Sequence, residues 1–308
     1  MNKRVAVMDL GTNTFHLLIA EGTITNYHEL IHEHIAVKLG EGGINKGFIQ
    51  PEAFQRGLDT MQLFQRDIEA HNVTEVRAIA TSMLRNAANG TQFINEVAKL
   101  TGISIEIIDG DAEANFIYQG VKAGDCLSAG NVLIIDIGGG SVEFILGNDE
   151  YIIWKQSFEI GAARLMDKFH KSDPIPQASI DELNNYLEDK LKDMLTAVAG
   201  YEIGQLIGSS GSFETLAEVV EQAKGRHFDL KTTKNYLFEN DDLIAATDKL
   251  INSSHAERKA NKAIIPIRVD MIVVASLITR FVMRKLAIGN VLMSTNSLKE
   301  GVLTGMLD

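Results

Sequence analysis

The sequence has one cysteine among its 308 residues, no long apolar segment and no basic region. The single thiol, Cys126, excludes an internal disulfide framework and is typical of a protein from a reducing compartment. The first residues lead directly into an apolar strand that contains Asp9, without the apolar core and cleavage site of a secretory signal. We therefore expect a cytoplasmic protein.

Membranes and duplex nucleic acid are not expected partners. The most apolar late stretch, Met271 to Ile278, is far shorter than the roughly 20 residues of a membrane span, so it predicts a buried helix. The formal net charge is −12, with no basic tail or half, which argues against binding to a nucleic acid duplex. A polyanionic ligand would need a local basic groove or bound cations.

Two stretches share a pattern in which an aspartate precedes a glycine turn. Aligning "VMDLGTNTFHL" with "IIDIGGGSVEF" pairs Asp9 with Asp136 and Gly11 with Gly138. Apolar runs on both sides of each turn predict a β-hairpin, whereas a Rossmann glycine loop opens a helix. The Walker A pattern is absent as well. The chain is therefore predicted to have two similar halves, each opening on a hairpin with a turn that suits phosphate.

A carboxylate beside such a turn indicates a metal ion. Asp9 and Asp136 would repel phosphate, but carboxylates hold Mg²⁺, which bridges to phosphate oxygens. Backbone N–H groups of the turns supply further donors. One such aspartate alone could equally cap a tight turn, but two in register favour a Mg²⁺–phosphate ligand. The predicted cradle consists of Gly11, Thr12, Asn13, Thr14, Gly138, Gly139, Gly140 and Ser141.

A third loop, "IGSSGSFETL", passes from a short apolar strand through small residues into a helix. Amides at that helix start form a further candidate anion site, which adds Ser209, Ser210, Gly211 and Ser212 to the cradle. Elsewhere the patterns predict strands over 76–82 and 103–109 and helices over 51–70, 92–102, about 113–121 and about 297–307. Ser179 with Glu182 predicts a capping box at the start of another helix.

One metal motif is rejected. "HELIH", His28 to His32, would bind zinc only on a helix, where positions four apart share a face. Its β-branched surroundings predict extended structure, in which those positions lie roughly 13 Å apart. We therefore expect no zinc site there.

The ordered set of motifs resembles the exopolyphosphatase/guanosine pentaphosphate phosphohydrolase (Ppx/GppA) family of the actin-like ATPase (ASKHA) superfamily. The resemblance covers about residues 5–307 and rests on "MDLGTNTFHLLIA", "VRAIATSMLRNAANG", "IEIIDGDAEANFIYQGV", "LIIDIGGGSVEF", "IGAARL", "IGSSGSFETLAEV" and "IPIRVDMI…MSTNSLKEGVL". It implies an α/β protein of two actin-like (ribonuclease H-like) domains with an interdomain cleft. The small polar residues near 124–130 place the domains at 1–125 and 126–308, with the C-terminal helix of about 297–308 packing on the first.

The resemblance implies a Mg²⁺-dependent hydrolase that removes terminal phosphate from polyphosphate or guanosine pentaphosphate by attack of an activated water. Glu113 falls on the family's proposed catalytic glutamate, although by itself it would pass for a helix-start acid. Glu143 is assigned to water positioning and, with Asp9 and Asp136, to Mg²⁺; a solvated surface position is its alternative.

Arg85 matches a family arginine that could clamp phosphate as a planar fork, with surface ion pairing as the alternative, and Arg268 is a lesser candidate. Many relatives have Glu and Arg where this chain has Ala112 and Asn115, so a charge pair beside Glu113 is lost.

Expected partners are polyphosphate or guanosine penta- or tetraphosphate, and a homodimer is a candidate assembly because family members are often dimers. Two other functions stay open. One is an ATP-using kinase of the superfamily, against which "DGDAEAN" and "ATSMLRNA" argue. The other is a non-catalytic sensor of phosphorylated nucleotides, suggested by the missing arginine.

Overall fold

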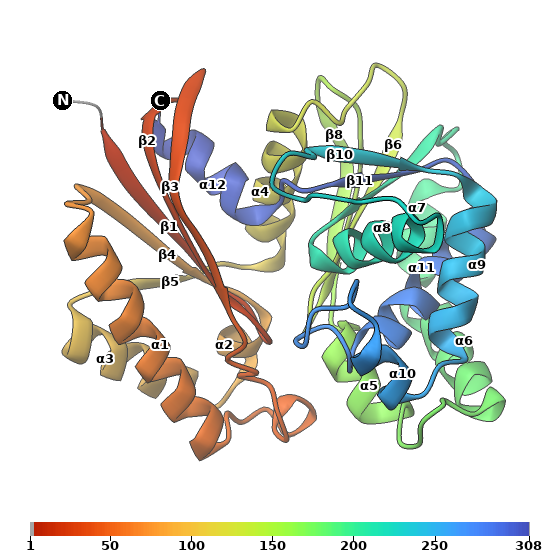
Figure 1. Ribbon diagram of the computed structural model, residues 1–308, viewed down its shortest axis with the longest axis horizontal. Helices are drawn as coiled ribbons and strands as arrows, with labels where there is room; N and C mark the ends of the chain where they lie inside the picture. Colours follow the sequence, from red (N-terminus) through yellow and green to blue (C-terminus); the bar gives the residue numbers. More distant parts are fainter. Residues whose placement is uncertain (1–2, 308) are drawn as a thin grey trace.

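Two mixed β-sheets frame the protein in a computed structural model that describes residues 3–307 (Figure 1). The first has the order β3-β2-β1-β4-β5, with β1 (Arg4–Leu10), β2 (Phe15–Thr23), β3 (Asn26–Ile35), β4 (Glu75–Ala80) and β5 (Ile105–Ile107). The second has the order β10-β11-β9-β6-β7-β8, with β6 (Val132–Ile137), β7 (Val142–Gly147), β8 (Ile152–Phe158), β9 (Gln205–Ser209), β10 (Asn235–Phe238) and β11 (Val291–Ser294).

Both sheets repeat one topology. Three antiparallel strands form a meander, and the first of them also pairs in parallel with the strand that starts the other half of the sheet, β4 or β9. A second parallel strand follows in each, and β10 adds an antiparallel edge to the second sheet. This is the ribonuclease H-like order of two actin-like domains, so the predicted fold class and the two predicted hairpins are confirmed.

Most helices cover the outer faces of the sheets. The first sheet carries α1 (Pro51–Ala70), α2 (Ser82–Asn86) and α3 (Gly90–Thr101), with the short helix η1 (Ile44–Lys46) nearby. The second carries α5 (Ala162–Phe169), α6 (Gln177–Lys190), α7 (Lys192–Val198), α8 (Gly211–Ala223), α9 (Asn240–Ile251), α10 (His255–Ala260) and α11 (Ile272–Leu286). Each domain thereby has its own apolar core on its outer side.

The remaining two helices, α4 (Gly110–Ala123) and α12 (Leu298–Leu307), lie between the sheets (Figure 1). They share a third apolar core with inward-facing residues of both sheets, such as Val7 and Ile134. The two helices touch through glycines: a Cβ added at Gly120 would lie 1.9 Å from the carbonyl oxygen of Ser297, and one at Gly301 would lie 1.8 Å from that of Phe116. The last helix of the chain therefore packs on α4 and β1 of the first domain.

Several predicted elements are confirmed. Proline starts α1, Gly102 ends α3 in the left-handed conformation, and the stretch from Met271 lies in the buried helix α11. "HELIH" is extended within β3, as expected. Among the described residues, no helix is long and apolar enough to cross a bilayer.

Several boundaries differ from prediction. Helix α4 begins at Gly110, because the side chain of Asp109 accepts from the amide of Ala112 at 2.8 Å and caps the helix one turn earlier. The capping box at Ser179 is wrong, since α6 already begins at Gln177 behind Pro176, whose ring fixes φ near −70°. Strand 76–82 ends at Ala80, where α2 follows, and strand 103–109 is reduced to the three residues of β5.

The glycine contact between α4 and α12 predicts a strong stability effect for one methyl group. Gly301→Ala should lower the free energy of unfolding by about 1–3 kcal/mol, because its Cβ meets backbone that cannot rotate away. Gly305→Ala in the same helix is the matched control: nothing lies within 4 Å of its Cβ, so it should raise stability by about 0.5–1 kcal/mol. Urea unfolding measures both; equal effects would contradict the close crossing.

Candidate active site

On the inward face of each sheet, apolar side chains are followed by an aspartate at the equivalent position of the first strand. In β1, Val7 belongs to the core around α4 and α12, and Asp9 is the next residue on that face because strand side chains alternate. In β6, Ile134 and Asp136 repeat this arrangement. The two aspartates come close enough for the charge of Asp136 to add to burial, the larger cause, in raising the pKa of Asp9 to about 7.

The first two glycine loops meet each other. A Cβ on Gly139 would lie 3.2 Å from Cβ of Thr12, and one on Gly140 would lie 2.6 Å from its Oγ1. The carbonyls of Gly138 and Gly139 accept from amides at the start of α5, at 2.9 and 3.0 Å. Because C=O and N–H of a trans peptide point in opposite directions, the amides of Gly139 and Gly140 point away from α5. The loops therefore form one cradle with backbone donors.

The first loop is folded on itself and tied to the segment after β3. The amide of Gly11 donates to the carbonyl of Thr14 at 3.1 Å, and the carbonyls of Thr12 and Asn13 accept from Gly40 and Lys38 at 3.0 and 2.7 Å. These contacts use backbone groups only, so the side-chain polar groups of Thr12 and Asn13 take no part in them.

The third loop joins the cradle between β9 and α8. Ser209 Oγ donates to Oδ2 of Asp136 at 2.9 Å, and Ser210 has a positive φ of 72°, which costs a serine backbone strain. Gly211 leaves room for Arg268: a Cβ there would lie 2.1 Å from the guanidinium Nη2. The structure thus brings Arg268, with the buried Ser212, to the loop that sequence predicted as an anion site.

Glu113 lies in the first turn of α4 and is held by Arg85. Arg85 Nη1 donates to Oε2 of Glu113 at 3.0 Å and to the carbonyl of Ile108 at 2.9 Å. Burial, followed by the nearby charge of Glu143, raises the pKa of Glu113 well above its usual value, and Arg85 opposes this shift. Arg85 supplies a charge partner for the proposed base even though Asn115 replaces the usual arginine. The Arg85 guanidinium hydrogen-bonds to Glu113 and Glu159, and its contact with phosphate stays a prediction.

Glu143 pairs with Asp136 across the second hairpin. It is 1% exposed, which excludes the solvated alternative, and it accepts from Ser157 Oγ at 2.6 Å. Burial and the charge of Asp136 raise its pKa to about 8. Asp136 has a raised pKa for the same leading reason, burial.

These carboxylates would fit a hydrated Mg²⁺ bound together with phosphate. Among residues 3–307 there is no group of three or more His, Cys, Asp or Glu side chains arranged to hold a metal unaided. Mg²⁺ needs only one or two protein carboxylates, with waters and phosphate oxygens completing its shell. Burial, with the charge of Asp136 adding to it, raises the pKa values of both Asp9 and Glu143, and a cation bound here would favour the ionised form of each.

Sequence reasoning missed two groups at this site. Lys299, in the first turn of α12, is 6% exposed and pairs with Glu300 at 3.0 Å, and its charge acts on Asp9 and Asp136. A lysine in the first turn of a helix, where the macrodipole disfavours a cation, was the available signal. The other is Glu159, which accepts from Ser82, Asn86, Arg85 and Arg164 and thereby joins the two domains below the cradle.

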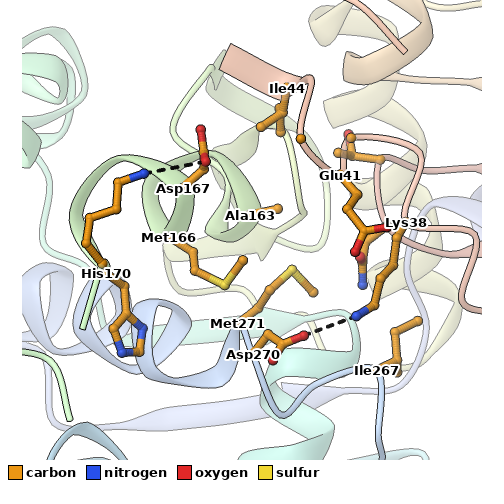
Figure 2. Close-up of a pocket in the computed structure, with 15 residues that line it drawn as sticks. Lys38, Glu41, Ile44, Ala163, Met166, Asp167, His170, Ile267, Asp270 and Met271 are labelled. Atoms are coloured by element: carbon orange, nitrogen blue, oxygen red, sulfur yellow. Dashed lines mark hydrogen bonds and ion pairs between the residues drawn. The ribbon is translucent and has the colours of Figure 1, made fainter. Parts of the chain in front are cut away.

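A cavity of about 350 Å³ opens beside Thr12 and Asn13, between the domains (Figure 2). Met166 and Met271 face into it from α5 and the start of α11 (Figure 2). Lys38 Nζ and Asp270 Oδ2, 3.1 Å apart, bridge the domains at its rim. Its charged lining has no cationic excess: Lys38 and Lys171 stand against Glu41, Asp167 and Asp270.

The sequence matches the family described as the Ppx/GppA phosphatase family over residues 18–308. A Haemophilus influenzae protein provisionally named an exopolyphosphatase is 27% identical over 304 residues, 98% of this chain and 90% of its own length. The crystal structure of an exopolyphosphatase from Cytophaga hutchinsonii is 42% identical, with a TM-score of 0.96 over 99% of this chain and 98% of that one. A Ppx/GppA family member from Aquifex aeolicus shares the fold, at 22% identity and a TM-score of 0.82 over 100% and 98% of the two chains.

The raised pKa of Glu143 predicts a pH-dependent stability. The folded protein keeps this proton up to about pH 8, whereas the usual pKa is 4.5, so the stabilisation is present at low pH and is lost as pH rises through that interval. Glu143→Gln stays neutral throughout. Its stability advantage over wild type should therefore grow by at least about 1 kcal/mol across the interval, one pKa unit being worth 1.36 kcal/mol.

Urea unfolding in EDTA at several pH values measures this difference. Glu106→Gln, which alters the exposed ion pair with Arg77, serves as control and should show no such growth. A constant difference between Glu143→Gln and wild type would contradict the assignment.

Proposed function

The chain belongs to the Ppx/GppA phosphatase family, and from this premise we propose that it is a phosphoanhydride hydrolase that removes terminal phosphate from inorganic polyphosphate. The relatives named as exopolyphosphatases, including the one of 42% identity, support this substrate class. The cradle, the carboxylates and Glu113 meet at one place between the domains, as such a reaction requires.

One observation carries the proposal. Four buried side-chain polar atoms in residues 3–307 have no hydrogen-bond partner: Thr12 Oγ1, Asn13 Nδ2, His16 Nδ1 and Arg268 Nε. Buried polar atoms are almost always paired, so a group of unused ones indicates a missing partner. All four can donate a hydrogen bond, and they lie on or beside the cradle. A ligand rich in anionic oxygens satisfies them.

The residues divide the chemical work. Asp9, Asp136 and Glu143 would hold Mg²⁺, which neutralises charge on the transferred phosphate. Glu113 accepts the proton of the attacking water, and its raised pKa makes it a stronger base once ionised. Arg85 fixes the carboxylate by a 3.0 Å hydrogen bond. Because only the terminal phosphate must enter, an acidic protein can still bind a polyanion.

Glu113→Gln tests this role. It should lower the rate of phosphate release from medium-chain polyphosphate by roughly 10²–10⁴-fold, because the general base is lost while size and hydrogen bonding are kept. Asp111→Asn is the matched control, since this acid lies in the same turn of α4 with its side chain 73% exposed. Release should require Mg²⁺ and stop in EDTA. Wild-type protein that binds polyphosphate without turnover would instead make the chain a receptor.

Guanosine pentaphosphate is a second candidate substrate, and the cavity beside the first loop favours it. Its volume of about 350 Å³ lies within the range of small-molecule sites. Two methionines, and a charged lining in which carboxylates outnumber lysines by three to two, suit an uncharged ring better than further phosphates. A nucleoside there would lie next to Thr12 and Asn13, and thus next to phosphates in the cradle.

Met166→Ala distinguishes the two substrates. Loss of the apolar wall should raise KM for guanosine pentaphosphate by roughly 5- to 10-fold, about 1–1.4 kcal/mol of apolar contact. Phosphate release from polyphosphate should change less than about 2-fold, because a phosphate chain gains little from a thioether. Leu63→Ala, an exposed leucine on α1, controls for general effects. Equal losses with both substrates would argue against a nucleoside in this cavity.

A further inference from the structure

The two hairpins place different chemistry at one equivalent position. Asp136 pairs with Glu143 across β6 and β7, and Asp9 pairs with His16 across β1 and β2. Paired residues of neighbouring strands project from the same face. The position that holds a carboxylate in the second hairpin therefore holds an imidazole in the first, and both side chains face the space between the domains.

The His16 ring has an unused donor position. Its Nδ1 is buried and has no hydrogen-bond partner, whereas Glu143 accepts from Ser157 on the next strand at 2.6 Å. The corresponding neighbour of His16 is His34, whose ring centroid lies 6.1 Å away, too far for a hydrogen bond between the rings. Phe15 and Leu17, on the opposite face of β2, are fully buried and fix the strand. The ring is therefore held in place without a protein partner.

Sheet order places His16 and Glu113 on opposite sides of the aspartates. In the first sheet, β1 with Asp9 lies between β2, which carries His16, and β4 and β5, beside which Arg85 holds Glu113. In the second sheet, β6 with Asp136 lies between β7, which carries Glu143, and β9, which leads to the third loop and Arg268. The cationic side chains of Arg268 and Lys299 lie near enough to His16 to help lower its pKa, after burial. One end of the site thus has the proposed base, and the other has His16 and Arg268.

We propose that His16 contacts the leaving group of the reaction, which is the shortened phosphate chain. Its Nδ1–H donates a hydrogen bond to an oxygen of the phosphate that adjoins the one removed. In phosphoryl transfer the attacking and leaving oxygens lie roughly in line. Water activated at Glu113 therefore expels a leaving group toward the opposite end, where His16 and Arg268 lie. His16 donates a hydrogen bond and transfers no proton. This inference rests on the proposed hydrolysis and adds the leaving-group contact to it.

A pair of nearly isosteric variants tests the hydrogen bond. His16→Asn keeps an N–H donor at the position of Nδ1, and His16→Leu removes it. We expect His16→Leu to lower kcat/KM for tripolyphosphate by roughly 10- to 100-fold, partly through weaker binding and further through kcat, because the bond strengthens as charge develops on the leaving oxygen. His16→Asn should retain activity within about 5-fold of wild type. His28→Leu, at an exposed position of β3, should change nothing.

Two further measurements separate this inference from the proposed function. Melting temperatures of His16→Asn and His16→Leu should agree closely, so that a difference in rate is not a difference in folding. Tripolyphosphate binding with Mg²⁺, measured by calorimetry in the Glu113→Gln protein, should weaken when His16→Leu is added and recover with His16→Asn. If wild type hydrolyses tripolyphosphate and His16→Leu matches it, the leaving-group role is overturned and the hydrolase stands. If wild type is inert, the hydrolase fails, and unchanged binding in the His16→Leu protein would overturn the contact as well.

Discussion

The crossing of α4 and α12 is the contact on which the rest of the structure depends. Gly120 and Gly301 let the two backbones touch, and the pair shares an apolar core with both sheets. Beyond the first turns of the two helices, their side chains no longer fill the space between the sheets. The inward-facing strand residues there are Asp9 and Asp136. The same two helix starts deliver Glu113 and Lys299 to the opening. Helix packing thus determines both the separation of the domains and which charged side chains line the gap.

The electrostatics of the gap explain how an acidic protein can handle a polyanion. Burial raises the pKa values of Glu113, Glu143, Asp9 and Asp136, which favours their neutral forms and so lowers the negative charge of the gap. Arg85 compensates Glu113 directly, and Lys299 acts on the aspartates. The basic groove that the composition lacks is replaced by a few buried cations and by backbone amides of three loops. A net charge of −12 is therefore compatible with a site for phosphate.

The sequence predicted what depends on local pattern and failed where distant residues decide. Both hairpins and the third loop could be predicted because apolar runs and glycine turns are local signals. The starts of α4 and α6 were placed too late, because Asp109 and Pro176 compete with the more obvious residues that follow them by a few positions. The partner of Arg85 could not be predicted, since Glu113 is 28 residues away and the pair forms only when the fold brings α2 and the start of α4 together.

The two hairpins share one backbone geometry but carry different side chains at an equivalent position. Each hairpin offers the position opposite its aspartate to the gap, because register and pleat are the same in both. In the second hairpin the next strand supplies Ser157, which satisfies Glu143 within the protein. In the first, the next strand supplies His34, which does not satisfy His16. Glu143 thus has a hydrogen-bond partner within the protein, whereas His16 Nδ1 would gain one only from a ligand. In the proposed mechanism, this difference between the halves gives the cleft its direction, with water attacking at one end and the leaving group departing at the other.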